Sequence, residues 1–204
     1  MGAGIARALG AEGASVIANY ASDREGAERT VRAIEASGGK AKAVQADMSK
    51  EADVRRLFST NKETFDRLDV LVNNAGVYRF GSAESVTVDE FHRQFDTNVL
   101  GPMLAVREAL PLFGAEGGSI INVGTGATEL TPPNAVIYIA SKLALNGVTG
   151  VLARELGPRR IRVNSLNPGM VATEGVPRVQ RLRLADRRNH RGGRRSSLKN
   201  APLA

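Results

Sequence analysis

The chain has 204 residues, of which 42% are hydrophobic and 24% are charged, and this length fits one domain with at most a short appendage. It contains no cysteine, which excludes a disulfide framework, a thiolate nucleophile and a cysteine-ligated metal. Its two histidines, His92 and His190, are far apart in the sequence, so we expect no zinc site. With no signal peptide and no uninterrupted apolar run of about 18 residues, we expect a cytoplasmic protein that does not enter a membrane.

The net charge of +7 is concentrated at one end of the chain. Residues 176–204 contain eight Arg, one Lys and one Asp, a balance of +8, which leaves −1 for residues 1–175. The same segment has few large apolar residues and no aromatic residue, which is typical of a disordered basic tail. We therefore expect one domain over 1–175 and a disordered tail over 176–204. Arginines without interleaved aromatic residues are weak evidence for nucleic-acid binding, so that function is disfavoured.

Short apolar runs alternate with amphipathic segments up to about Gly175, which indicates an α/β fold with a parallel sheet. The opening "MGAGIARALG" is compatible with a phosphate-binding turn and with an ordinary glycine-rich turn. Ser22 and Glu25 can form a capping box at the start of one helix, and Thr87 and Glu90 can cap a later, long helix. The predicted strands are 15–20, 41–46, 69–74, 119–123 and 161–166. The predicted helices include two long ones, near 88–113 and 135–157.

Polar and small residues follow the predicted strands at their carboxyl ends, the edge at which open α/β sheets bind ligands. These residues are Tyr20, Asp47, Asn74, Ala75, Gly76, Thr125, Pro168 and Gly169.

Tyr138 and Lys142 are four residues apart, so both side chains project from one face of a predicted helix. A nearby ammonium favours the phenolate and lowers the pKa of a tyrosine, which makes Tyr138 a candidate general acid/base. Thr125 lies just past a strand, where its hydroxyl could hold a carbonyl oxygen. Asn98 lies inside a predicted helix, where a residue of poor helix propensity needs a reason. The alternatives are a chance Tyr–Lys pair on a solvated face and a solvent-facing Asn98.

Four motifs occur in order along the chain: "NNAG" (73–76), "TNV" (97–99), "YIASK" (138–142) and "NPGMVAT" (167–173). With these motifs, residues 2–175 resemble the classical short-chain dehydrogenase/reductase (SDR) family, particularly its 3-oxoacyl-acyl-carrier-protein reductase-like and glucose-dehydrogenase-like members. The resemblance implies a Rossmann-like, doubly wound parallel sheet and a reaction between a ketone and a secondary alcohol. It also implies a small-molecule carbonyl or alcohol substrate, and a homo-oligomer, dimer or tetramer, assembled through the two long helices.

The resemblance also assigns catalytic roles. Tyr138 would exchange the proton with the substrate oxygen, and Lys142 would bind the nicotinamide ribose and lower the tyrosine pKa. Thr125 falls on the family's catalytic serine position, although its β-methyl restricts its rotamers. Asn98 would hold a water that links Lys142 to solvent.

The implied cofactor-binding residues begin with Gly2, the third glycine of the family's phosphate-binding turn. Asp47 would meet the adenine, and Asn74 to Gly76 would line the adenosine ribose. The complete implied set is Gly2, Tyr20, Ala21, Ser22, Asp47, Met48, Asn74, Ala75, Gly76, Tyr138, Lys142, Pro168, Gly169, Val171 and Thr173.

The end of the second family strand indicates the cofactor. NAD-preferring members carry an acid there, which binds the ribose 2′-hydroxyl. This chain has Tyr20, followed by Ala21 and Ser22, with Arg24 close by. An uncharged position near Ser and Arg accepts a 2′-phosphate better than an aspartate would, so NADP(H) is favoured over NAD(H). The alternative is that Tyr20 only packs against the adenine.

The sequence departs from the family pattern at both ends. The family's first strand and the first two glycines of its turn have no counterpart before Gly2, and residues 176–204 do not resemble the family's last segments. We therefore expect a sheet that lacks the family's first and last strands. A start codon further upstream and a shifted reading frame would explain the two departures. An inactive truncated or frameshifted remnant is thus the alternative to an active enzyme, and a basic-tailed binding module is a weaker one.

Overall fold

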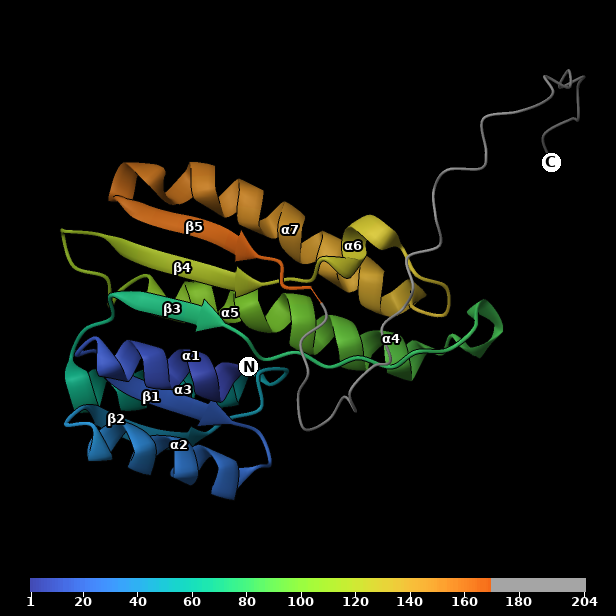
Figure 1. Cartoon of the computed structure of the whole chain (residues 1–204). Helices are drawn as coiled ribbons and strands as arrows, with labels where there is room; N and C mark the ends of the chain where they lie inside the picture. The colour runs from blue at the N-terminus through green and yellow to red at the C-terminus, as the bar shows by residue number, and fades with distance from the viewer. Residues whose placement is uncertain (170–204) are drawn as a thin grey trace, which may run out of the picture. The chain divides into compact units, whose positions relative to one another are not determined.

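The computed structural model describes residues 1–169, in which helices and parallel strands alternate (Figure 1). The strands are β1 (Ser15–Tyr20), β2 (Lys40–Gln45), β3 (Val70–Asn73), β4 (Gly118–Val123) and β5 (Ile161–Leu166). The α-helices are α1 (Gly2–Ala11), α2 (Arg24–Ala36), α3 (Glu51–Phe65), α4 (Val88–Phe95), α5 (Gly101–Ala109), α6 (Ala127–Leu130) and α7 (Val136–Leu156). Three shorter helical turns are η1 (Ala83–Ser85), η2 (Asp96–Leu100) and η3 (Gly157–Arg159). The predicted site residues Val171 and Thr173 and the predicted tail over 176–204 lie outside the described residues.

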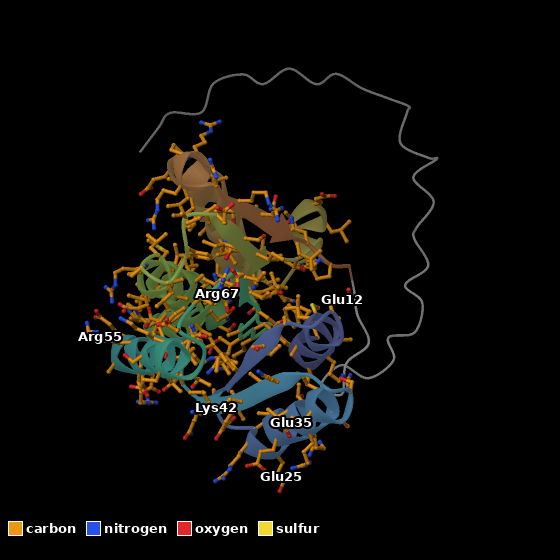
Figure 2. The ribbon with its side chains drawn as sticks, turned by 90° about the vertical axis from the view of Figure 1, so that its left-hand side faces the viewer. Glu12, Glu25, Glu35, Lys42, Arg55 and Arg67 are labelled. Carbon is orange, nitrogen blue, oxygen red and sulfur yellow. The ribbon has the colours of Figure 1, made fainter. Side chains whose placement is uncertain are left out.

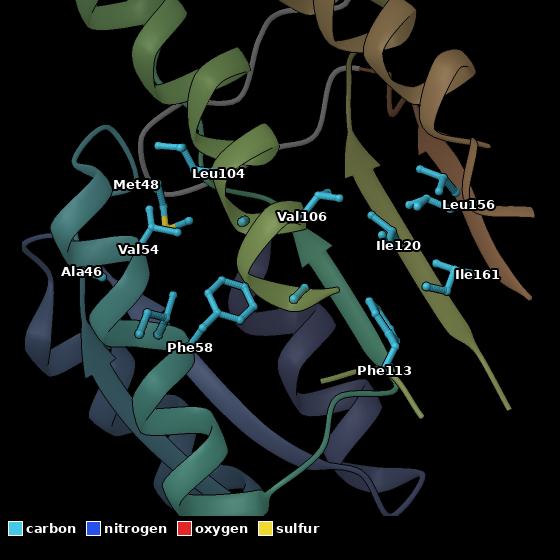
Figure 3. Close-up of a cluster of buried hydrophobic side chains, with 14 residues drawn as sticks. Ala46, Met48, Val54, Phe58, Leu104, Val106, Phe113, Ile120, Leu156 and Ile161 are labelled. Carbon is cyan, nitrogen blue, oxygen red and sulfur yellow. The ribbon is translucent and has the colours of Figure 1, made fainter. Parts of the chain in front are cut away.

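The predicted α/β fold and the predicted strands are confirmed. Two strands have the predicted bounds, 15–20 and 161–166, and the other three differ by one residue at one or both ends. All the strand pairs are parallel, β1 with β2 and β3–β4–β5 in that order. Helices α3 and α5 lie on one side of the strands and α1 lies on the other (Figures 2 and 3). Helices on both sides are the doubly wound arrangement.

The main hydrophobic core lies where α3 and α5 pack against the strands (Figure 3). Val54 and Phe58 project from α3, Leu104 and Val106 from α5, and Ile120 from β4, and all five side chains are buried. Burial of each large side chain contributes about 1.5–3 kcal/mol relative to exposure, so this contact supplies much of the stability of the domain.

Two details of the helix termini and helix course differ from the predictions. Helix α2 begins at Arg24, so Asp23 is its N-cap and accepts a 2.9 Å hydrogen bond from the Gly26 N–H; the Ser22–Glu25 box is wrong. Thr87 caps α4 as predicted, accepting from the Glu90 N–H at 3.2 Å. The long helix predicted near 88–113 is instead α4 and α5 joined by the π-helical turn η2.

Helix α7 with η3 is, within residues 1–169, the one helix long and apolar enough to cross a membrane. The helix meets this criterion by length and composition only, and 33% of its most apolar 18-residue stretch is buried within the fold. Its inner face, with Ile139, Leu145 and Leu156 buried, packs along β5 and η2. We interpret α7 as a core helix whose outer face is apolar.

The strands form two separate sheets, because no strand within residues 1–169 pairs with the second edge of β1 or of β3. These two strands point in the same direction and lie at the neighbouring edges of the two sheets (Figure 1). Helix α1 lies beside β1, with Ile5 and Leu9 only half-buried and with Gly10 fully buried against Ile34 of α2. Unpaired backbone edges and partly covered apolar side chains both weaken a sheet.

A strand supplied before Met1 should therefore stabilise the protein. We expect an added Val/Ile-rich segment of about five residues and a glycine turn to raise the urea midpoint of unfolding, because each buried backbone group left unpaired costs ~1–3 kcal/mol. The matched control carries the same extension with a proline at the centre of the added strand, which cannot complete the ladder. Equal midpoints for the two extended proteins would contradict this interpretation of the open edges.

Candidate active site

The side chain of Asn98 lies at the centre of the site, in the π-helical turn η2, and it is fully buried. Its Oδ1 accepts a 2.8 Å hydrogen bond from the Val77 N–H, and its Nδ2 donates to the Val77 carbonyl at 2.8 Å. Nδ2 also donates to the Ser141 Oγ at 3.0 Å. Asn98 is therefore not a solvent-facing residue: it ties the loop after β3 to η2 and α7. Isolated π turns within helices occur frequently at functional sites.

Lys142 is the second buried polar group of the site, with 5% of its surface exposed. Its Nζ donates to the Val123 carbonyl at the end of β4, at 2.8 Å, and burial lowers its pKa to about 8. An ammonium has three N–H donors, and the described residues accept this one hydrogen bond from it. A Cβ at Gly76 would lie 3.3 Å from both Lys142 Nζ and Asn98 Oδ1. The glycine thus leaves room beside two buried polar atoms.

Tyr138 lies one helical turn before Lys142 on α7, as predicted, and is half-buried. Burial raises the pKa of its phenol, and the hydroxyl of Thr125 opposes this shift through a side-chain hydrogen bond. The ammonium of Lys142 is directed to Val123, so the predicted lowering of the tyrosine pKa by Lys142 is not found; burial dominates. The structure brings Thr125, Tyr138, Lys142 and Asn98 together at the ends of β4 and α7.

Among residues 1–169, most of the predicted cofactor residues outside the helices follow the carboxyl ends of the strands, which point in one direction (Figure 1). Gly2 begins α1 next to Asn74, since a Cβ on Gly2 would lie 2.7 Å from Asn74 Nδ2. Tyr20 ends β1 and is half-buried, whereas Ala21 and Ser22 are exposed. Pro168 and Gly169 follow β5, and the carbonyl of Pro168 accepts a 2.9 Å hydrogen bond from the Gly126 N–H.

Asp47 and Met48 follow β2 and already have structural partners. The Asp47 carboxylate accepts hydrogen bonds from Ser49 N–H and Oγ at 3.0 and 2.7 Å, and the contacts with Ser49 lower its pKa. Met48 is buried, and its carbonyl would lie 2.6 Å from a Cβ at Gly101. The absence of a side chain at Gly101 lets α5 approach this turn closely.

Sequence reasoning missed four residues that build the site. Val77 and Ser141 complete the hydrogen bonds of Asn98, and Tyr78 and Phe80 place their rings 6.0 and 6.1 Å from that of Tyr138. Their positions next to predicted motifs could have indicated them. Ser141 lies inside "YIASK", and "VYRF" (77–80) directly follows "NNAG".

The buried ammonium of Lys142 makes a testable contribution to stability. Its pKa is about 8 in the folded chain and 10.5 in the reference state, so between these values the unfolded chain binds more protons and stability rises with pH. This shift corresponds to ~3 kcal/mol, because one pKa unit is about 1.4 kcal/mol. We expect Lys142→Met to be more stable at pH 7 and to lose most of the rise between pH 8 and 10.5. Urea unfolding at several pH values measures the free energy of unfolding of both proteins and its dependence on pH.

The matched control is Lys62→Met, at an exposed position on α3. It should keep the pH dependence of the wild type. The same pH slope in Lys142→Met and in the wild type would rule out a buried, pKa-shifted Lys142.

Comparison with known proteins assigns the chain to a family. Residues 1–182 match the short chain dehydrogenase family. An uncharacterized oxidoreductase of Methylorubrum extorquens is 51% identical over 176 residues, which cover 86% of this chain and 71% of that protein. 3beta-hydroxysteroid dehydrogenase 1 of Eggerthella lenta is 41% identical over 175 residues, 85% of this chain and 67% of that protein.

The fold also matches solved structures. A short chain dehydrogenase from Burkholderia cenocepacia in complex with NADP aligns with a TM-score of 0.83 at 39% identity, over 88% of this chain and 74% of that one. This likeness confirms the Rossmann-like fold. The matched region is thus most of this chain but only part of each relative's length. On these matches, and on the site that carries its motifs, the chain belongs to the short-chain dehydrogenase/reductase family of oxidoreductases.

Proposed function

We propose that the chain is an NADP(H)-dependent oxidoreductase that interconverts a small-molecule ketone and a secondary alcohol in the cytoplasm, with Tyr138 as general acid/base. One observation carries the proposal: Tyr138 lies one helical turn from the buried Lys142 on α7, and its phenol is near enough to the Thr125 hydroxyl for that hydroxyl to oppose the rise in its pKa. The names of similar proteins agree with this class of reaction, since one relative is a hydroxysteroid dehydrogenase and one solved structure is a ketoreductase with bound NADP.

The residues present fit a nicotinamide cofactor. Lys142 is buried, and its ammonium donates one hydrogen bond to the described residues, which leaves two N–H groups for a ligand. Because Gly76 has no side chain, there is space next to this ammonium. Lys142 would hold the nicotinamide ribose, and the amides at the start of α1 near Gly2 would face the phosphates. When bound, the nicotinamide supplies or accepts the hydride. The other residues that would hold it are Tyr20, Ala21, Ser22, Asp47, Met48, Asn74, Ala75, Pro168 and Gly169, with Val171 and Thr173 outside the described residues.

The proton is exchanged at the phenol oxygen of Tyr138. Because burial raises the pKa of this group, the phenol is protonated at neutral pH and can donate its proton to a carbonyl oxygen. The Thr125 hydroxyl can donate a second hydrogen bond to the same oxygen and thereby orient it. In the direction of alcohol oxidation the phenol must first lose its proton. The protonated phenol is the form that ketone reduction uses.

NADP(H) is the cofactor that the end of β1 supports. Tyr20 stands where a carboxylate would favour NAD(H), and Arg24 is the first residue of α2, which follows the end of β1. Asp23 is the acidic residue nearest to Tyr20 in the sequence, and its carboxylate already accepts a hydrogen bond from the Gly26 N–H as the cap of α2. Arg24 itself pairs with Glu28 at 2.7 Å but keeps 74% of its side chain exposed.

We also propose that the protein is a homo-oligomer through the outer face of α7. Val136, Leu143 and Val151 are 55%, 49% and 62% exposed there and follow one another at spacings of seven and eight residues. The exposed Ala140 and Gly147 lie between them on the same face. Apolar and small residues at helical spacing suit close packing against a helix of a second copy.

Tyr138→Phe should abolish turnover and leave NADPH affinity within about threefold of the wild type. The ring keeps its packing, whereas general acid/base groups typically contribute ~10²–10⁴ in rate. NADPH oxidation with a ketone and fluorescence titration of NADPH measure the two effects. Lys142→Ala is the contrast, because it should weaken both binding and rate. Retention of more than about a tenth of the wild-type rate by Tyr138→Phe would refute the assigned role, and no turnover by the wild type would favour the inactive remnant.

Tyr20→Asp should reverse the preference for NADPH over NADH. The new carboxylate would accept a hydrogen bond from the 2′-hydroxyl of NADH and repel the 2′-phosphate of NADPH. The ratio of kcat/KM for the two cofactors measures this, with Tyr20→Asn as the uncharged control. An unchanged ratio in Tyr20→Asp would argue against cofactor selection at the end of β1.

Leu143→Glu should shift the protein to a smaller species in analytical ultracentrifugation. A buried, unpaired carboxylate at the contact would cost several kcal/mol, enough to dissociate most interfaces of this kind. Ala33→Glu, at an exposed position on α2, adds the same charge outside this face and should leave the mass unchanged. Equal masses for Leu143→Glu and the wild type would contradict the proposed α7 interface.

A further inference from the structure

Two aromatic rings flank the phenol of Tyr138. The ring centroids are 6.0 Å apart for Tyr78 and Tyr138, 6.1 Å for Phe80 and Tyr138, and 5.5 Å for Tyr78 and Phe80. Within residues 1–169, Tyr78 and Phe80 remain 47% and 58% exposed, so much of their ring surface is uncovered beside the proton donor. The chain has three Tyr, six Phe and no Trp, and two of its three tyrosines are in this cluster.

The backbone that carries these rings is held in place by hydrogen bonds from other parts of the chain. Arg93 Nη2 donates to the Tyr78 carbonyl at 3.2 Å, and Nε2 of the fully buried Gln94 donates to the Arg79 carbonyl at 3.4 Å. At the other side of Phe80, the Gly81 N–H donates to the Asn134 carbonyl at 2.7 Å. The loop therefore has a defined conformation before any ligand binds.

Glu90 fixes the two side chains that hold this loop. Its carboxylate accepts from Arg93 Nη2 and from Gln94 Nε2, both at 2.7 Å, and the contact with Arg93 lowers the pKa of Glu90 to about 2. Arg79, the charged residue between the two rings, also pairs with Glu90, at 3.9 Å. Glu90 thus holds both guanidiniums beside the rings, and the two rings supply the apolar part of this surface.

The rings do not form a closed stack with the phenol. Tyr78 and Phe80 meet Tyr138 at interplanar angles of 62° and 85°, so neither ring lies flat on the phenol. Aromatic faces bind flat apolar surfaces well, and rings held by a fixed backbone lose little freedom on binding. The ring faces offer no partner to an anionic or highly polar group, and the guanidiniums of Arg79 and Arg93 beside them would repel a cationic substrate.

We propose that Tyr78 and Phe80 form a platform for the body of the substrate, and that the substrate is a flat, fused-ring, uncharged ketone or alcohol. This inference rests on the proposed function, because the platform matters through its position beside Tyr138. Tyr78 and Phe80 are then specificity-determining residues, and Tyr138 remains the group that exchanges the proton.

Binding of 1-tetralone, a flat fused-ring ketone, tests the platform. Hexan-2-one is the acyclic comparison, and isothermal titration in the presence of NADP⁺ measures both affinities. We expect the wild type to bind 1-tetralone at least about fivefold more tightly than hexan-2-one, and Phe80→Ala and Tyr78→Ala to lose most of that difference. Tyr78→Phe keeps the ring and should keep the affinity. Phe91→Ala is the matched control, because its ring stacks on Phe95, 4.2 Å away, and not on Tyr138.

Equal affinities of the wild type for the two ketones would overturn the platform, and so would an unchanged preference in Phe80→Ala. The outcome also separates this inference from the proposed function. A preference for 1-tetralone that depends on Phe80, in a protein that reduces neither ketone, supports the platform and contradicts the proposed function. Reduction of both ketones with equal kcat/KM contradicts the platform alone.

Discussion

The carboxamide of Asn98 joins three separate parts of the chain at one buried point. It hydrogen-bonds both backbone groups of Val77 and the hydroxyl of Ser141, and it sits in a π-helical turn. The bond to Ser141 is buried and the two bonds to Val77 are partly buried, and a buried group left without a partner costs ~1–3 kcal/mol. The conformation of the loop after β3 and its attachment to α7 depend on this side chain. The spacing between Gly76 on the loop and Lys142 on α7 follows from it.

The same attachment sets the electrostatics of the site. Lys142 is buried beside the Val123 carbonyl with a pKa of about 8, so its charged form is weakly held and gains from any further acceptor. Tyr138 is half-buried, and its pKa is raised rather than lowered. The hydroxyl oxygens of a cofactor ribose would accept further hydrogen bonds from the Lys142 ammonium. In the chain alone the phenol is a proton donor, which accords with ketone reduction at neutral pH.

Much of the fold and part of the site follow from sequence patterns, because they depend on local spacing. The buried strands are short apolar runs between helices, and Tyr138 and Lys142 share a helix face because they are four residues apart. The break at Asp96–Leu100 was missed, because Phe91, Phe95 and Val99 recur at the spacing of one continuous helix; the extra residue of the turn is stabilised by tertiary contacts of Asn98.

Contacts between distant segments could not be predicted in the same way. The aromatic residues of "VYRF" have no helical or strand period, so only the fold shows that two of them meet Tyr138. The hydrogen bond from Lys142 to Val123 spans 19 residues, and burial raises the Tyr138 pKa that the sequence predicts to be lowered. The most direct test of the account is the rate of NADPH-dependent ketone reduction by the wild type, Asn98→Ala and Ser141→Ala, with melting curves to establish that each is folded. We expect a loss of at least about tenfold in kcat for Asn98→Ala and a much smaller loss for Ser141→Ala, which keeps both bonds to Val77. A folded Asn98→Ala protein with the wild-type rate would contradict it.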